Sequence, residues 1–335
     1  MKLTAYTDES VFDELHSEWD DLLHRSTSDL IFCTWEWQST WWHIYQAGQL
    51  WVIACRDDAG RLVGLGSWFI QHANGERVVR TIGCVDVTDY VDVIVDPEYA
   101  DVVQDAFAEF LKHNHDAFDR INLCNIPEAS PTLARFPGKL QEHGFEVEVE
   151  LQEVCPVIEL TDDWEAYLER LDKKQRHEIR RKIRRAESEA ALNWYVVDQT
   201  HNIDEEVEKF LALMRASHPE KAKFLDDPHN LAFFKAIVPL VFQCGWLKMS
   251  FLVVNGTPCA AYCDFDYNGH IMVYNSGLLP VENAHLSAGI VLLSYNIRDA
   301  IANHRAVFDF LRGNETYKYR MGAIDTKVFK LKARL

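Results

Sequence analysis

Hydrophobic and polar residues alternate along the first half of the chain with two different periods. A period near 3.6 residues predicts helices, and strict alternation predicts strands. The segment Asp57-Asp58-Ala59-Gly60 is typical of a hairpin turn between two of these strands. We therefore expect helices over 10–25, 35–45, 99–113 and 131–144, and strands over 2–7, 51–55, 61–70, 78–82, 90–95, 120–124 and 145–151.

The second half repeats this order of elements. Two of its strands are separated by Asn255-Gly256, the strongest two-residue hairpin signal. The repeated order indicates an internal duplication, although no repeat of individual residues accompanies it. We expect helices over 162–190, 204–217, 228–243, 287–303 and 315–321, and strands over 157–160, 194–197, 247–254, 257–266, 270–279, 307–311 and 326–333.

These patterns predict an α/β (α+β) protein with mixed, mostly antiparallel sheets flanked by helices. A chain of 335 residues exceeds the usual size of one hydrophobic core. We therefore expect two domains, residues 1–152 and 153–335. The boundary falls in a segment without a Gly/Ser-rich linker.

Charge divides unevenly between the two halves. Residues 1–150 carry a formal charge of -17 and residues 151–335 carry -1, out of a total of -18. A strongly acidic half repels nucleic acid and anionic membranes, so a phosphate-bearing ligand is expected on the second half. That half holds eight basic residues within Lys173–Arg185. This run is either a nucleic-acid contact or a solvated helix face that pairs with the acidic half.

The chain lacks the signals of several other classes. No apolar run at its start resembles a signal peptide, and no stretch is long enough to predict a membrane span, so we expect a cytoplasmic protein. The eight cysteines are scattered without a Cys-x-x-Cys pair, which predicts reduced thiols and no metal site. The sequence contains no Gly-x-Ser-x-Gly motif, so it does not predict a serine hydrolase.

The most informative segment runs from Tyr274 to Gly289. It reads as a strand, a polar loop and then small residues that begin an apolar helix. The first amides of a helix and the positive end of its dipole bind phosphate, and Ser287, Ala288 and Gly289 leave room for it. The alternative is an ordinary helix start with Ser287 as the N-cap.

A carboxylate interrupts the next apolar strand. Asp309 lies between Phe308 and Phe310, where an unpaired charge is costly to bury. Arg312 or Lys318, which follow soon after, would supply a partner. A structural ion pair and a catalytic pair both explain this pattern.

The segment Phe308–Glu315, followed by Tyr317–Arg320, resembles the signature of the CelD-like acetyltransferases. These belong to the GNAT superfamily, are often associated with polysaccharide biosynthesis and are distantly similar to the FemABX aminoacyltransferases. The resemblance extends to Leu286–Gly289, to the basic segment Leu171–Lys182, and to the aromatic residues Phe32, Trp35, Trp37, Trp41 and Trp42.

This resemblance implies two tandem GNAT folds, with acetyl-CoA or another acyl-CoA bound by the second. It places CoA pyrophosphate at Ala284, His285, Leu286, Ser287, Ala288 and Gly289. The lysine of the Tyr-Lys block lies in the active region of FemABX relatives. We therefore expect the catalytic groups among Tyr274, Asp309 and Lys318.

The first half lacks these features. Its corresponding loop, Asp96–Val103, holds three carboxylates and no glycine, so it would repel a pyrophosphate and is expected to be a degenerate copy. Acidic and aromatic residues nearby match a region that FemABX relatives use for the acceptor; a solvated acidic loop is the alternative. The acceptor-site candidates are Asp86, Asp89, Tyr90 and Asp92, together with Arg312 from the second half.

We therefore expect an acyltransferase that moves an acyl group, with acetyl as the leading case, from CoA to an amine or hydroxyl. The expected acceptor is a glycan precursor or another sugar-containing small molecule. Two alternatives stay open. One is a FemABX-like ligase that uses aminoacyl-tRNA, the only case in which nucleic acid would be a partner, and the other is a non-catalytic binding module.

Overall fold

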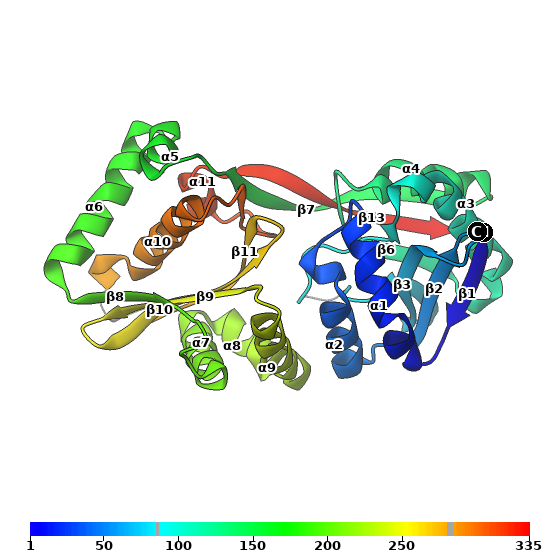
Figure 1. The fold of residues 1–335 in the computed structure, drawn as a ribbon, viewed down its shortest axis with the longest axis horizontal. Helices are drawn as coiled ribbons and strands as arrows, with labels where there is room; N and C mark the ends of the chain where they lie inside the picture. Colours follow the sequence, from blue (N-terminus) through cyan, green and yellow to red (C-terminus); the bar gives the residue numbers. More distant parts are fainter. Residues whose placement is uncertain (85–86, 280–283) are drawn as a thin grey trace. The chain divides into compact units, whose positions relative to one another are not determined.

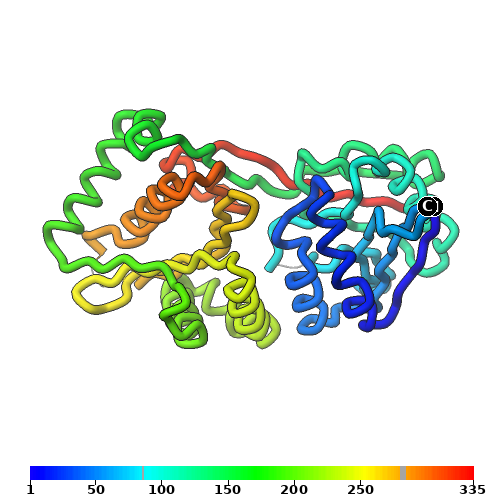
Figure 2. The backbone as a smooth tube through the Cα atoms, in the orientation of Figure 1, coloured from blue at the N-terminus to red at the C-terminus, as the bar shows by residue number. Residues whose placement is uncertain are grey.

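The computed structural model describes residues 1–84, 87–279 and 284–335 (Figure 1). The chain forms two compact units: unit 1 is Met1–Glu153 with Lys327–Leu335, and unit 2 is Val154–Thr326. Both ends of the chain therefore belong to unit 1 (Figure 2). The first boundary lies beside the expected one, but the C-terminal segment differs from expectation. It joins unit 1 because β13 (Ile324–Arg334) pairs with β6 (Arg120–Pro127).

Unit 1 contains a mixed sheet with the strand order β1-β2-β3-β4-β6-β13. β4 and β6 are parallel, while the other neighbours along this path are antiparallel. A short strand, β5, pairs with β3. The remaining bounds are β1 Lys2–Tyr6, β2 Gln49–Arg56, β3 Leu62–Ala73, β4 Glu76–Thr81 and β5 Ile94–Val95, with helices α1 Ser10–Arg25, α2 Trp35–Tyr45, α3 Ala100–His113 and α4 Pro131–Glu142.

Aromatic side chains fill the core of unit 1 on both faces of its sheet. On one face, Trp68 packs against Phe107 of α3 and Phe136 of α4, with ring centroids 5.5 and 6.4 Å apart. On the other face, Trp41 of α2 lies 5.5 Å from Phe69. These large rings are almost fully buried, so they explain how an acidic half builds a stable core.

The expectation that all eight cysteines are reduced is wrong for two of them. Cys84 and Cys124 form a disulfide, with Cα atoms 6.1 Å apart, and the other six are free. The two partners are separated by 40 residues in sequence. Only the folding of unit 1 brings them together, and no local spacing signals the pair.

In unit 2 the strands are hydrogen-bonded in the order β7-β12-β11-β10-β9-β8. β11 and β12 are parallel, and the other printed pairings are antiparallel. Asn255 and Gly256 join β9 to β10 with φ of 51° and 85°, as a type I′ hairpin requires. The bounds are β7 Glu146–Glu159, β8 Leu192–Val196, β9 Leu247–Val254, β10 Thr257–Tyr267, β11 His270–Leu278 and β12 Val307–Asp309.

Helices cover both faces of the strands of unit 2 (Figure 1). One face carries α5, α6 and α10, whose apolar residues share a core with β9–β12. The other face carries α7, which packs on β10 and β11 and contacts α8 and α9. The bounds are α5 Trp164–Arg170, α6 Lys173–Glu189, α7 Ile203–Ser217, α8 Pro219–Asp226, α9 Pro228–Gln243, α10 Ala288–Ala302 and α11 Thr316–Arg320.

The expected single helix over 162–190 is wrong, because the chain breaks it into α5 and α6. Asp163 accepts a hydrogen bond from the backbone of Ala166, and Asp172 accepts one from Gln175. Each aspartate therefore caps its own helix, with Leu171 extended between them. The expected α/β class, with mixed sheets flanked by helices, is confirmed.

Candidate functional site

An opening forms in unit 2 where two parallel strands separate. β11 and β12 pair only from His270 with Val307 to Met272 with Asp309, and β11 then continues to Leu278. β12 ends because Leu311 adopts a left-handed φ of 55°. The backbone N–H groups of Phe310 and Gly313 donate to carbonyls of the β7 segment instead. One side of β11 is thereby released from β12 over its second half.

A β-bulge reorients the side chains along this released segment. Cys263 of β10 faces Asn275 and the next residue, Asp264, faces Val273, so Tyr274 is the extra residue of β11. The ring of Tyr274 packs against Phe234 of α9 and Phe265, at centroid distances of 5.3 and 4.9 Å. Bulges of this kind often lie beside active sites, where they redirect a side chain.

Helix α10 begins beside the same segment. Ser287 occupies its N-cap position with a left-handed φ of 56°, and its side chain makes no capping hydrogen bond. The alternative of an ordinary serine-capped helix is therefore wrong. A helix start without a side-chain cap leaves its first amides for another acceptor.

A cavity of about 460 Å³ lies against this helix start. Its wall combines the small residues of α10 with aliphatic and aromatic residues from the strands and from α11. The lining residues are Tyr262, Ser276, Leu278, Leu279, Ala284, Ser287, Ala288, Gly289, Ile290 and Tyr317. The cavity thus has a polar, small-residue end and an apolar body.

Four of the six residues predicted to bind the cofactor line this cavity: Ala284, Ser287, Ala288 and Gly289. The other two do not. Leu286 is buried in the core, and His285 is exposed, with its Nε2 3.6 Å from a carboxylate oxygen of Glu189. The loop before them, residues 280–283, lies outside the described residues.

Gly289 faces into the cavity. A Cβ built on it would lie 3.7 and 3.9 Å from the two methyl carbons of Leu278, which are ordinary contact distances. Its backbone also avoids the left-handed region. A small side chain would therefore fit at this position, whereas a long one would extend into the cavity.

Lys318 is buried and bound entirely by its own loop. Its ammonium group donates to the carbonyl oxygens of Arg312 and Gly313 at 2.9 and 3.0 Å, and its Nζ lies 3.4 Å from the carbonyl of Leu311. It also pairs with Glu315 at 2.9 Å. The sequence-based hypothesis of an Asp309–Lys318 ion pair is thus wrong. The left-handed backbone at Leu311 and Gly313 turns the carbonyls toward the amine.

Asp309 and Arg312 sit at the two ends of the same turn. Asp309 is buried, and its Oδ1 accepts a hydrogen bond of 2.7 Å from the backbone N–H of Leu311. Arg312 is half-buried. Asp309 therefore stabilises the turn at which β12 separates from β11. Lys318 binds the carbonyl groups of the same turn.

The acceptor-site candidates of unit 1 lie in the segment between β4 and β5. Asp92 is buried and accepts hydrogen bonds of 2.6 Å from the hydroxyl groups of Ser28 and Ser130. Burial raises the pKa of its carboxyl group. Tyr90 is buried and Asp89 half-buried, so residues 89–92 do not form a solvated loop. Asp86 lies outside the described residues.

Lys221 of α8 is a site residue that the sequence analysis missed. Its ammonium group donates to the carbonyl of Ser276 at 2.6 Å and lies 3.2 Å from the Ser276 hydroxyl oxygen, on the released part of β11. Burial lowers the pKa of Lys221 to about 8, against the opposing effect of the Glu315 charge. Neither α8 nor this contact has a local sequence signal that we recognised.

A buried polar network lies beneath α10. Asn296 donates to Ser250 and Asp264 at 2.8 and 3.3 Å. Asp264 is fully buried, and burial raises the pKa of its carboxyl group well above the usual value. A neutral Asp264, which faces Val273 beside the bulge, avoids placing an uncompensated charge in the core of unit 2.

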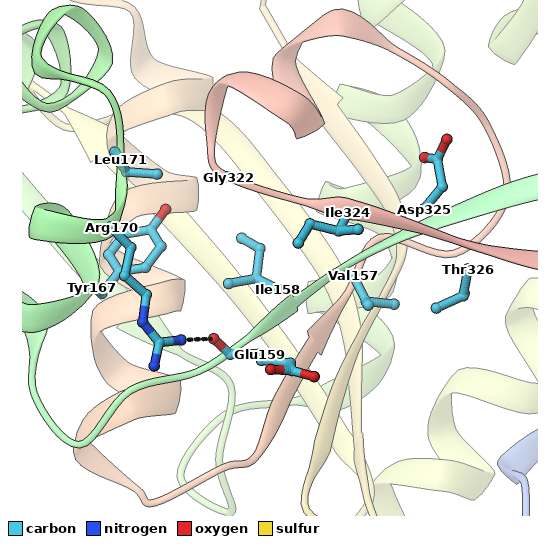
Figure 3. Close-up of a pocket in the computed structure, with 10 residues that line it drawn as sticks. All are labelled: Val157, Ile158, Glu159, Tyr167, Arg170, Leu171, Gly322, Ile324, Asp325 and Thr326. Atoms are coloured by element: carbon cyan, nitrogen blue, oxygen red, sulfur yellow. Dashed lines mark hydrogen bonds between the residues drawn. The ribbon is translucent and has the colours of Figure 1, made fainter.

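A second cavity, of about 350 Å³, lies near the end of β7 (Figure 3). Its polar groups bond to neighbouring backbone: Tyr167 donates to the carbonyl of Met321 at 2.7 Å, and Arg170 donates to that of Glu159 at 3.2 Å. Mainly aliphatic residues, such as Ile158 and Ile324, form the rest of the wall. None of the residues predicted for catalysis or cofactor binding lines it.

The comparisons with known proteins agree with a GNAT assignment for unit 2. Residues 173–319 match the family described as an acetyltransferase (GNAT) domain. No curated protein matches the chain. Most of unit 2 is therefore similar to a GNAT domain, and the helix start and the released strand described above both lie inside the matched residues.

Several solved structures share the fold along almost the whole chain. The crystal structure of FemX has 11% identity and a TM-score of 0.67, and the alignment covers 98% of this chain and 97% of FemX. The C-terminal domain of a putative lysylphosphatidylglycerol synthetase from Agrobacterium fabrum has 10% identity and a TM-score of 0.58, with 97% and 92% covered. The structure of L-PGS from Bacillus licheniformis has 10% identity and a TM-score of 0.56, and the alignment covers 95% of this chain and 91% of that one. At such identities the similarity concerns the fold alone.

Among the described residues, no helix is both long enough and apolar enough to span a bilayer.

Proposed function

We propose that unit 2 binds acyl-CoA in the cavity at the start of α10 and transfers the acyl group, with acetyl as the leading case, to an amine or hydroxyl. One observation carries this proposal. The cavity joins a helix start that no described side chain caps to a strand released from its neighbour, and both features lie within residues that match a GNAT acetyltransferase domain. Pyrophosphate would take the helix start and the pantetheine arm the released strand.

The two ends of the cavity suit the two parts of such a ligand. The first amides of α10 and its dipole favour negative charge, and the small side chains of Ala288 and Gly289 allow close approach. Leu278, Leu279 and Tyr262 offer an apolar wall for an uncharged arm. In unit 1, the described residues at the start of α3 include Asp101 and follow Glu98. Their carboxylates would repel a pyrophosphate, so we propose that unit 1 binds no CoA.

The chemistry would consist of direct attack by the acceptor on the thioester carbonyl. Positioning and backbone N–H groups near the bulge would supply most of the acceleration. Tyr274 remains a candidate for proton transfer because the bulge sets its position. Lys318 and Asp309 instead hold the turn that keeps β12 away from β11.

The acceptor class rests on the resemblance to CelD-like acetyltransferases. We propose a sugar-containing small molecule or glycan precursor that presents an amine or hydroxyl. An acetyl-CoA titration of the full chain tests the core of the proposal. We expect one CoA to bind per chain. Two bound CoA molecules would contradict a degenerate unit 1, and no binding would refute the function.

The exposed surface of α6 favours a second candidate, aminoacyl transfer from tRNA. Among the described residues, Lys173, Lys174 and Arg184 form no ion pair, and all three line one surface hollow of α6. Unpaired cations on one helix suit a nucleic-acid backbone. Lys173→Glu with Lys174→Glu would then abolish aminoacyl-tRNA binding, whereas acyl-CoA binding with no tRNA binding would exclude this candidate.

A further inference from the structure

Lys221 reaches the released segment of β11 from the opposite face to α10. It lies on α8, which packs against α7 and α9. Its Nζ contacts both oxygens of Ser276, the carbonyl at 2.6 Å and the hydroxyl at 3.2 Å. Ser276 in turn forms part of the wall of the cavity at the start of α10. A serine hydroxyl therefore connects the cavity to a lysine behind it.

The environment of Lys221 differs from that of an ordinary structural lysine. The side chain is half-buried, yet among the described residues it forms no ion pair. Ser276 is its hydrogen-bond partner from β11, and Glu315, which is paired with Lys318, is the charge that acts on it from the loop before α11. Among the described residues that line the cavity, the other titratable groups are Tyr262 and Tyr317, whose pKa values burial raises.

These surroundings change the protonation of the amine. Burial favours its neutral form and lowers the pKa of Lys221 to about 8, so roughly a tenth of the amine is neutral at pH 7 and about half at pH 8. A neutral lysine is a competent base, and perturbed groups at cavity walls are candidates for such a role. Lys248, by contrast, forms an ion pair with Asp299 at 2.7 Å.

We propose that Ser276 and Lys221 form the proton relay of the acyl-transfer reaction, in which Ser276 contacts the acceptor and Lys221 receives the proton. This inference rests on the proposed function. The acceptor nitrogen or oxygen forms a bond to the thioester carbonyl carbon and gives its proton to Ser276 Oγ. The Ser276 hydroxyl proton passes to Lys221 Nζ. The carbon–sulfur bond then breaks, and the CoA thiolate is released while the ammonium returns its proton to solvent.

The variants separate proton transfer from packing. Lys221→Met removes the base, and Lys221→Arg keeps a long cation that cannot accept a proton. Ser276→Ala breaks the relay, while Ser276→Thr retains the hydroxyl. Lys223→Met is the matched control, because Lys223 is an exposed lysine on the same helix.

The first measurement needs no acceptor. Lysine labelled with ¹³C at Cε is titrated by NMR in the full chain, and the Lys221 signal is assigned from the Lys221→Arg variant. We expect a midpoint near pH 8. We also expect this signal to move when acetyl-CoA is added, because Ser276 lies in the cavity wall. A midpoint at the ordinary lysine value of about 10.4, or a Lys221 signal whose chemical shift does not change when acetyl-CoA binds, would overturn the proposal.

The second measurement follows release of the CoA thiol from acetyl-CoA, with glucosamine as the probe amine, across pH. Wild type and Lys223→Met should share a rate that rises with a midpoint near pH 8. Lys221→Met, Lys221→Arg and Ser276→Ala should lose this rise with pH and should be roughly 100-fold slower than wild type, whereas Ser276→Thr should keep the rise because it keeps a hydroxyl. Calorimetry should show unchanged acetyl-CoA binding in all of them.

Two failures are distinguishable. If wild type binds no acetyl-CoA, the proposed function is wrong. If acetyl-CoA binds and Lys221→Met keeps the wild-type rate and pH profile, the function stands and the relay is refuted. Where glucosamine supports no release above background, the NMR titration alone decides.

Discussion

Replacing Lys318 by methionine tests whether this buried cation shapes the site or serves the acceptor. Methionine has a similar length and no charge. The substitution removes hydrogen bonds to three backbone carbonyls, at 2.9, 3.0 and 3.4 Å, and the contact with Glu315. Leaving a buried acceptor without a partner costs about 1–3 kcal/mol. The three carbonyls share one donor and lie in a turn, so their costs are not additive.

We expect a total loss of roughly 3–5 kcal/mol in the free energy of unfolding. Little of it comes from the ion pair, since the Glu315 side chain is 58% exposed and water can solvate its charge. In a unit the size of unit 2, each kcal/mol lowers the melting temperature by about 2–4 °C, which gives a decrease of roughly 6–20 °C. Glu315→Gln is the control and should cost less than about 1 kcal/mol.

Differential scanning calorimetry of the full chain provides the readout. If Lys318→Met melts within about 2 °C of wild type, binds acetyl-CoA normally and yet fails to turn over, the structural assignment is refuted. Lys318 would then contact the acceptor, as the resemblance to FemABX proteins suggested.

Three further outcomes are expected. Gly277→Ala should cost roughly 1–3 kcal/mol, measured by urea unfolding, because its Cβ would lie 2.5 Å from the backbone nitrogen of Met214 in α7; a neutral effect would contradict this packing. Burial raises the pKa of Asp264, so above about pH 4 the unfolded chain loses a proton that the folded chain keeps, and the free energy of unfolding falls as pH rises. Asp264→Asn should weaken this fall, and an unchanged pH dependence in the variant would contradict a protonated Asp264. Thiol titration in denaturant without reductant should find six free cysteines, whereas eight would disprove the Cys84–Cys124 bond.

The features that the sequence predicted well have local causes. Asn255-Gly256 specifies a turn through its own backbone preferences, and the hairpin of β9 and β10 follows. Small residues at 287–289 before an apolar run predicted a helix start, and α10 begins at Ala288. The residues near Asp309 resemble the CelD-like signature, and they form the turn at which β12 ends. In each case a few adjacent residues determine the outcome.

The features that the sequence concealed depend on distant contacts. Lys318 lies in a polar, Gly-containing segment, yet it is buried, because the left-handed backbone at Leu311 turns carbonyls toward it. Lys221 meets a serine 55 residues away, and α8 itself was not predicted. Tyr274 became an extra residue only through the register of two strands. A single sequence contains no direct signal for such pairings.

The measurement that tests the central claim most directly is acetyl-CoA binding to wild type, Gly289→Ala and Gly289→Glu by isothermal titration calorimetry, with folding checked by circular dichroism. A methyl group at Gly289 meets Leu278 at an ordinary distance, so the alanine variant should bind within about threefold of wild type. A carboxylate at the start of α10 would satisfy the helix dipole and repel pyrophosphate, so the glutamate variant should bind at least about 100-fold more weakly. Unchanged affinity in a folded Gly289→Glu variant would contradict the proposed site.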